Sequence, residues 1–198
     1  MPVPRKLIRV AWMAILLGVT MQVIVLLAGG STKTILRDTL SKVAWSSIVC
    51  FGVAAGAAAA SKNRVRLMGL AGLIAAPAAF AAARVVHKAF TFGAGNAAGE
   101  RMAIVLLLAG MKAGEYFTFG LVTGWLATER FDRAWHYATV GALTGLYFGG
   151  LIATVTAGGG RVSPIPVIAN EVLFPVGCAL VLFASKMLTA SEAPASTT

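Results

Sequence analysis

The sequence predicts an all-helical, polytopic integral membrane protein with six transmembrane helices. Of its 198 residues, 58% are hydrophobic and only 12% are charged. A soluble domain averages about 45–50% apolar and about 25% charged residues. Six apolar segments reach the roughly 20 residues that a spanning helix needs. Because only short polar segments separate them, we expect a single membrane domain over residues 1–189 and a disordered, polar tail at 190–198.

The predicted spans cover residues 8–29, 41–60, 66–87, 102–127, 136–157 and 166–188. The first resembles a signal peptide, but its apolar stretch from about Val10 to Ala28 is longer than the 7–15 residues typical of one, so we expect it to be retained. The separator after it, "STKTILRDTLSK", favours a brief interfacial helix with Ile35, Leu36 and Leu40 toward lipid.

The second and third spans are rich in small residues. Gly52 and Gly56 stand four residues apart in the second, a spacing that allows close helix packing in membranes. The third is rich in alanine and contains Pro77, which removes one hydrogen bond of the helix. This pattern is typical of a crowded central helix, or alternatively of a hinge or pore-facing helix.

The fourth span contains two charges in its apolar run. Lys112 lies about 15 Å along the helix from Met102, close to the middle of a hydrocarbon core about 30 Å thick. Glu115, three residues later, shares its face. Each charge at such a depth costs about 2.5–3.5 kcal/mol, so an intramembrane ion pair is first a functional hypothesis. The alternative is a structural pair that holds helices in register.

The surroundings of this pair extend the predicted site. Gly110 and Gly114 flank Lys112 and favour a local unwinding of the helix. Tyr116 and Thr118, with Thr123 further on, add hydroxyl groups nearby. We therefore predict a binding site for a solute or ion around Lys112 and Glu115.

The fifth span carries Gly141, Gly145 and Gly149 at four-residue spacing, a glycine zipper. Each glycine removes a side chain from the same ridge and lets another backbone approach. Two interpretations are open: packing within the chain, and an interface between subunits of a homo-oligomer.

The sixth span adds Asn170 and Glu171 near its start and Pro175 within it. One interpretation has Glu171 reach the interface or cap the helix. The other makes Asn170 and Glu171 the mouth of a cavity that ends at Lys112, with Arg84 and His87 as partners or headgroup anchors. The tryptophans mostly flank helix ends and are predicted to form interfacial belts; they are Trp12, Trp45, Trp125 and Trp135.

The halves of the chain share features with two interpretations, a 3+3 inverted repeat and a chance similarity. "KVAW" at 42–45 matches "DRAW" at 132–135, and a glycine pair follows each. Pro77 and Pro175 occupy corresponding third helices. Because three helices is an odd number, the second half would be inverted across the membrane, as in many transporters.

Charge predicts orientation and partners. The chain has 17 Lys and Arg and a formal net charge of +10. These residues are spread over the loops, a pattern that favours contact with anionic lipids and not nucleic acid binding. The positive-inside rule narrowly predicts that both termini are cytoplasmic. We expect the location to be a bacterial inner membrane.

Catalytic and metal-binding residues are sparse. Cys50 and Cys178 are distant in sequence and show no ligand spacing, so no metal, cofactor or disulfide framework is predicted. Asp38 and Asp132 are the two aspartates and fall on opposite sides of the predicted membrane, which disfavours an enzyme. The preferred function is a small channel or transporter that uses the Lys112 and Glu115 pair. The alternative is a non-catalytic subunit or assembly factor of a larger membrane complex.

Overall fold

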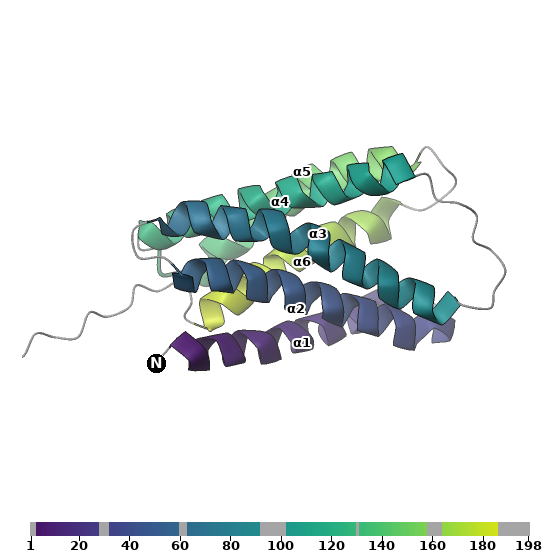
Figure 1. Cartoon of the computed structure of the whole chain (residues 1–198), viewed down its shortest axis with the longest axis horizontal. Helices are drawn as coiled ribbons and strands as arrows, with labels where there is room; N and C mark the ends of the chain where they lie inside the picture. Colours follow the sequence, from purple (N-terminus) through teal and green to yellow (C-terminus); the bar gives the residue numbers. More distant parts are fainter. Residues whose placement is uncertain are drawn as a thin grey trace, which may run out of the picture.

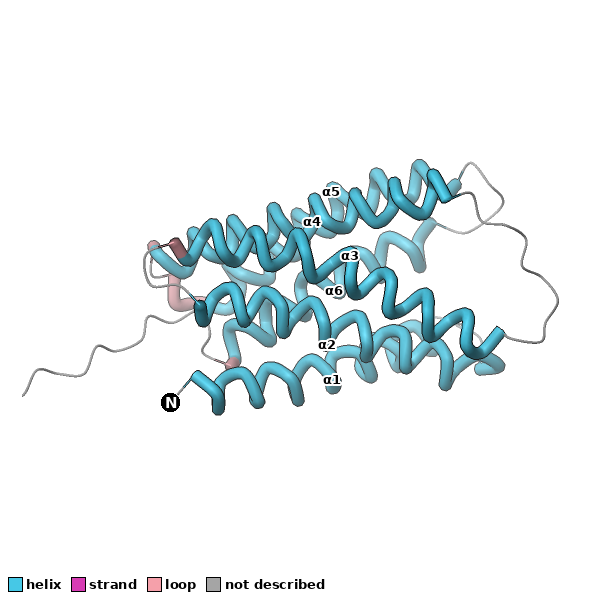
Figure 2. Tube along the Cα trace, viewed as in Figure 1, coloured by secondary structure: helices cyan, strands magenta, loops and turns pink. Residues whose placement is uncertain are grey.

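Six α-helices form a bundle in the computed structural model, which describes residues 3–27, 32–59, 63–91, 102–129, 131–157 and 164–185. The elements are α1 (Val3–Leu27), a short 3-10 helix η1 (Thr32–Thr34), α2 (Ile35–Ala59), α3 (Arg64–Thr91), α4 (Met102–Thr128), α5 (Ala134–Ala157) and α6 (Pro164–Ala184). Within these described ranges the chain contains no β-strand (Figure 2).

Successive helices run in opposite directions along the long axis of the bundle (Figure 1). The first residues of α1 and the last of α6 consequently lie at the same end. The opposite end holds the starts of α2, α4 and α6. We call the end that holds these three starts the α2-start end. Lys112 and Glu171 lie in the halves of α4 and α6 that are nearer to this end.

Five helices, α1 to α5, are long and apolar enough to cross a membrane. Their outward faces carry large apolar side chains, including Leu16, Ile74 and Leu106. Such extensive exposed apolar surface is typical of a face covered by lipid. The sixth, α6, runs for 21 residues from Pro164 to Ala184 and is the shortest of the six. These helices are compatible with an integral membrane protein.

The described part of the polar segment between the first two spans does not form the separate interfacial helix that was predicted. Within the described residues 32–59 no separate interfacial helix is present, because α2 begins at Ile35 and continues without a break to Ala59. Ile35, Leu36 and Leu40 do point outward, but from the first turns of α2 itself. Asp38 accepts a hydrogen bond from Thr34 and pairs with Arg37, which stabilises the start of this helix.

The glycine ridges lie where two helices of the same chain meet. A Cβ atom added to Gly141 or Gly145 would stand 2.6 Å or 2.5 Å from backbone atoms of α6. In α2, added Cβ atoms at Gly52 and Gly56 would meet Ala75 and Leu67 of α3 within 2.6 Å. The ridge of α5 is thus occupied by α6 and is not available to a second subunit.

The third helix packs between α2 and α4, as a central helix does. It remains helical through Pro77. Against α4 the backbones approach closely, because a Cβ atom at Gly72 would stand 2.1 Å from the carbonyl oxygen of Tyr116. The equivalent atom at Gly120 would stand 2.3 Å from the carbonyl oxygen of Met68. The predicted tail, 190–198, lies outside the described residues.

Candidate functional site

One lysine and two glutamates form a buried charged cluster between α4 and α6. The ammonium of Lys112 donates to Oε2 of Glu115 at 2.7 Å and also to Oε2 of Glu171. Glu115 is 0% exposed, and Lys112 and Glu171 are each 8% exposed. We call Lys112, Glu115 and Glu171 the charged cluster.

Lys112 and Glu115 are neighbours because of helix geometry, and Glu171 reaches them because α5 and α6 pack closely. Lys112 and Glu115 are three residues apart on α4 and therefore share a face. Glu171 comes from α6, 59 residues away in sequence from Lys112. A Cβ atom at Gly149 would stand 2.7 Å from the Cβ of Glu171. The glycines of α5 therefore make room for the segment of α6 that carries Glu171.

The cluster lies well inside the bundle. Lys112 follows the start of α4 by about 15 Å, and Glu171 follows the start of α6 by about 10 Å, at 1.5 Å per residue. Both helices start at the same end. The interpretation in which Glu171 reaches the interface is therefore wrong, since its side chain is buried against Lys112.

Aromatic rings cover the cluster on the side of α2. The Lys112 ammonium lies 5.3 Å from the ring centroid of Trp45, within the range of a cation–π interaction. Tyr116 and Phe174 pack against the same indole, with ring centroids 6.1 Å and 6.5 Å away. The predicted belt role of Trp45 is wrong, because this side chain is 9% exposed and faces the interior.

The other three tryptophans, Trp12, Trp125 and Trp135, have exposed side chains. Sequence position alone did not separate Trp45 from these residues. The useful signal was its distance from the helix start, because Trp45 lies ten residues into α2 and so at the depth of Lys112.

Two polar atoms beside the cluster have no hydrogen-bond partner among the described residues. They are Oε1 of Glu115 and Nε1 of Trp45. Buried polar atoms are normally paired, and an exception needs an explanation such as a bound ion or water. With all three groups ionised, one ammonium faces two carboxylates and the cluster carries one net negative charge.

The remaining predicted site residues are distributed differently. Tyr116 is buried beside the cluster, whereas Thr118 is exposed and points away from it. Asn170 is half-buried on α6, next to Glu171. Thr123 is buried and donates to the carbonyl oxygen of Phe119 in its own helix. The predicted unwinding around Lys112 is wrong, because α4 is continuous from Met102 to Thr128.

Several polar contacts between helices were not predicted. The thiols of Cys50 in α2 and Cys178 in α6 are both buried and lie near each other, although the residues are distant in sequence. Lys42 donates to the side-chain oxygen of Gln22 in α1 at 2.8 Å. Ser46 donates to the carbonyl oxygen of Ala14 at 2.7 Å. No group of three or more potential metal ligands occurs in the part of the chain that the structure describes.

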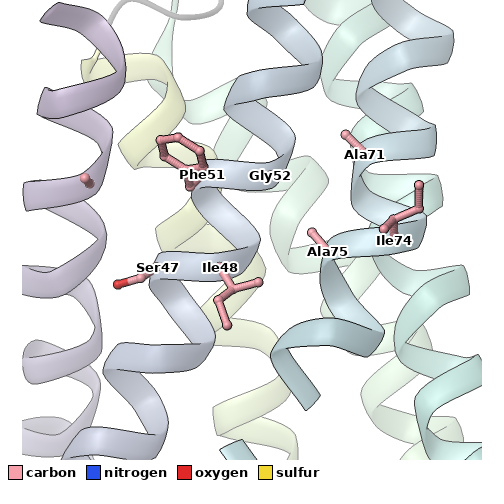
Figure 3. A pocket seen from close by; sticks show the side chains of 8 residues that line it. Ser47, Ile48, Phe51, Gly52, Ala71, Ile74 and Ala75 are labelled. Carbon is pink, nitrogen blue, oxygen red and sulfur yellow. The ribbon is translucent and has the colours of Figure 1, made fainter. Parts of the chain in front are cut away.

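Two cavities lie apart from the charged cluster. The larger, 550 Å³, is formed by α1, α2 and α3 and is shown in Figure 3. Its walls are apolar apart from Ser47, and they include Phe51, Gly52 and Ile74. The smaller, 370 Å³, is lined by α2, α3 and α4 and is basic. Arg84 and His87 line this second cavity, and the guanidinium of Arg84 lies 5.8 Å from the ring centroid of Phe80.

The fold and the cluster together define a helical bundle suited to a membrane, with ionisable side chains in its interior. No family model, curated protein or solved structure matches the chain.

Proposed function

We propose that the protein is a small membrane channel or transporter that binds an ion or small solute at the charged cluster. The observation that carries this proposal is the excess carboxylate. Glu115 is fully buried and has one carboxylate oxygen without a hydrogen-bond partner among the described residues. Ionisable groups inside a membrane are costly and commonly mark ion pathways and proton relays.

Charge balance favours a cation as the bound species. A proton or a monovalent cation beside Oε1 of Glu115 would neutralise the net negative charge of the three ionised groups. A proton is the smaller of the two and fits without opening the helix packing. An anion would have to approach two carboxylates that already share one ammonium.

The architecture proposed for this function has six spans. At 1.5 Å per residue, the 21 residues of α6 extend about 31 Å, close to the thickness of a hydrocarbon core. We place both termini in the cytoplasm of a bacterial cell and the α2-start end outside. A homo-oligomer remains part of the proposal, with its interface away from the glycine ridge of α5.

The inverted repeat is also retained as a proposal. In the first half, Gly52 of α2 packs against Ala75, two residues before Pro77 of α3. In the second half, Gly141 of α5 packs against Pro175 of α6. Corresponding glycines therefore meet the corresponding proline regions, which supports a common origin of the two halves.

The alternative is a non-catalytic subunit or assembly factor of a larger membrane complex. The position of the two described cavities favours it, because neither is lined by a residue of the charged cluster. Purification in native lipid, followed by mass measurement of the intact complex, separates the two proposals. A foreign protein bound at fixed stoichiometry would favour the alternative.

The test of the transport proposal is a flux assay in liposomes, with protons, monovalent cations and small anions screened separately. We expect flux of one cation with the unchanged protein. Glu115→Gln removes the excess charge but keeps the shape of the side chain, so it should reduce this flux at least tenfold while the protein stays folded. Equal flux with Glu115→Gln, or flux of anions alone, would contradict the proposal.

A further inference from the structure

The second cavity combines basic side chains with apolar walls. It lies between α2, α3 and α4, has a volume of 370 Å³, and is lined on its α3 side by Arg84, His87 and Lys88. Three residues that carry or can carry positive charge thus converge on one cavity within two turns of one helix. Arginine suits phosphate oxygens because its planar group donates two parallel hydrogen bonds.

A serine on α2 adds a hydroxyl group next to the same cavity. Ser41 lines the cavity opposite α3. Its hydroxyl oxygen is buried and has no hydrogen-bond partner among the described residues. A rotation of this side chain would turn the hydroxyl toward the cavity, where it would donate to a phosphate oxygen.

The depth of the cavity matches the boundary between headgroups and acyl chains. Ser41 and Leu108 each lie six residues, or about 9 Å, inside the first residue of their helices. Lys88 lies only three residues before the end of α3. Phe80 and Leu108 supply an apolar floor, while Arg84 and Lys88 lie progressively closer to the surface. Basic pockets between membrane helices are known to hold phospholipid headgroups.

The cavity also lies one helical turn from the charged cluster. Leu108 precedes Lys112 by four residues on α4, and Ser41 precedes Trp45 by four residues on α2. Residues four apart share a helix face. The cavity therefore lies above the cluster, toward the α2-start end, on the same faces of both helices.

We propose that this cavity is a binding site for a phosphate group, carried by an anionic phospholipid or present as free inorganic phosphate. Arg84 and Lys88 bind the phosphate oxygens, the Ser41 hydroxyl donates to one of them, and Phe80 and Leu108 contact the apolar part of a lipid. This inference does not depend on the proposed transport function, because binding is measured without flux.

The test uses the full chain in detergent, with phosphatidylglycerol and inorganic phosphate as separate probes. Bound lipid is counted by mass spectrometry of the intact protein, and phosphate binding is measured by thermal stabilisation. Arg84→Gln with Lys88→Gln should weaken binding about 30-fold, since each cation near the surface contributes roughly a fivefold effect. Lys33→Gln with Arg66→Gln is the matched control, because both residues are exposed and neither lines the cavity.

Two further variants distinguish specific binding in the cavity from nonspecific attraction to surface charge. Leu108→Trp fills the cavity without changing charge and should also weaken binding. Ser41→Ala should weaken it a few-fold, because it removes one hydrogen bond. Circular dichroism reports whether each variant is folded, and a misfolded variant leaves the others to decide.

The probes distinguish the two sources of phosphate. Retention of phosphatidylglycerol that inorganic phosphate does not displace would identify a lipid site, and displacement by inorganic phosphate would identify a site for the free anion. Either result supports the proposal. Equal losses in the control pair, unchanged binding with Leu108→Trp, or no binding of either probe would overturn it.

Discussion

Replacement of Lys112 by methionine tests whether the two buried carboxylates depend on its ammonium. Lys112→Met keeps an unbranched side chain, shorter by one atom, and removes the only charge that offsets Glu115 and Glu171 within the cluster. Both glutamates would then be buried and uncompensated. We expect the variant to be strongly destabilised.

The magnitude follows from the burial of all three groups. Removal of one partner of a buried ion pair costs about 3–5 kcal/mol. Here one ammonium serves two carboxylates, so we expect the upper end, about 5 kcal/mol. For a chain of this length, 1 kcal/mol shifts the unfolding temperature by about 2–4 °C, which gives a decrease of about 10–20 °C.

The informative comparison is the variant that removes every charge of the cluster. Because Glu171 also pairs with Lys112, all three residues must change, as in Lys112→Met with Glu115→Leu and Glu171→Leu. Replacement of buried ion pairs by apolar groups is often neutral or stabilising by about 1–4 kcal/mol. The triple variant should therefore unfold at or above the temperature of the unchanged protein.

Thermal unfolding in a mild detergent, followed by circular dichroism, measures both variants. The reasoning would be refuted if Lys112→Met were as stable as the unchanged chain, because its charge would then compensate nothing. It would also be refuted if the triple variant lost as much stability as the single one. Shape and hydrogen bonding, and not unpaired charge, would then explain the loss.

Three further predictions concern packing and orientation. Gly145→Leu should lower the free energy of unfolding by at least about 3 kcal/mol, since its Cβ would stand 2.5 Å from the carbonyl oxygen of Glu171. Gly150→Leu should change the unfolding temperature little, because a Cβ there meets nothing within 4 Å. Equal effects of the two variants would argue against the contact between α5 and α6. Trp45→Leu should lose about 3 kcal/mol of unfolding free energy, because it leaves a cavity and removes the cation–π contact. Trp12→Leu, at a side chain that is 66% exposed, should be nearly neutral in the same thermal unfolding measurement. A neutral Trp45→Leu would place the indole outside the core. A cysteine introduced at Ser31 should react with a membrane-impermeant maleimide in intact cells, while the native cysteines stay protected because both are buried; reaction only after lysis would reverse the proposed orientation.

The sequence predicted the helices well because each is a long apolar run bounded by polar residues. It misplaced the start of α2, since "ILRDTL" contains two charges and yet continues the helix without a break. The glycines that flank Lys112 predicted an unwound segment that the structure does not contain. The hydrogen bonds of the helix hold α4 intact through both glycines, although a Cβ atom at Gly110 would meet nothing within 4 Å and one at Gly114 would only touch the ring of Phe148.

The candidate site was predicted in part. Lys112 and Glu115 could be paired from their spacing, because helix geometry is local. Their contact with Glu171 depends on how closely α6 packs against the glycines of α5. No local sequence pattern encodes this packing. The same reason explains why Thr118 was included in the site. Trp45 was assigned to the interface because the predicted helix began at residue 41, six residues after the observed start at Ile35. Residues on one helix can be ordered by periodicity, but the partner of each face is decided by tertiary packing.

The most direct test of the central claim is flux through the folded triple variant. Its stability shows that the bundle is intact, so lost flux cannot be attributed to unfolding. The claim that the charged cluster binds the transported ion predicts at least a hundredfold loss of cation flux in liposomes at equal protein density. Full flux with a folded triple variant would contradict the claim and reduce Lys112, Glu115 and Glu171 to a structural contact between α4 and α6.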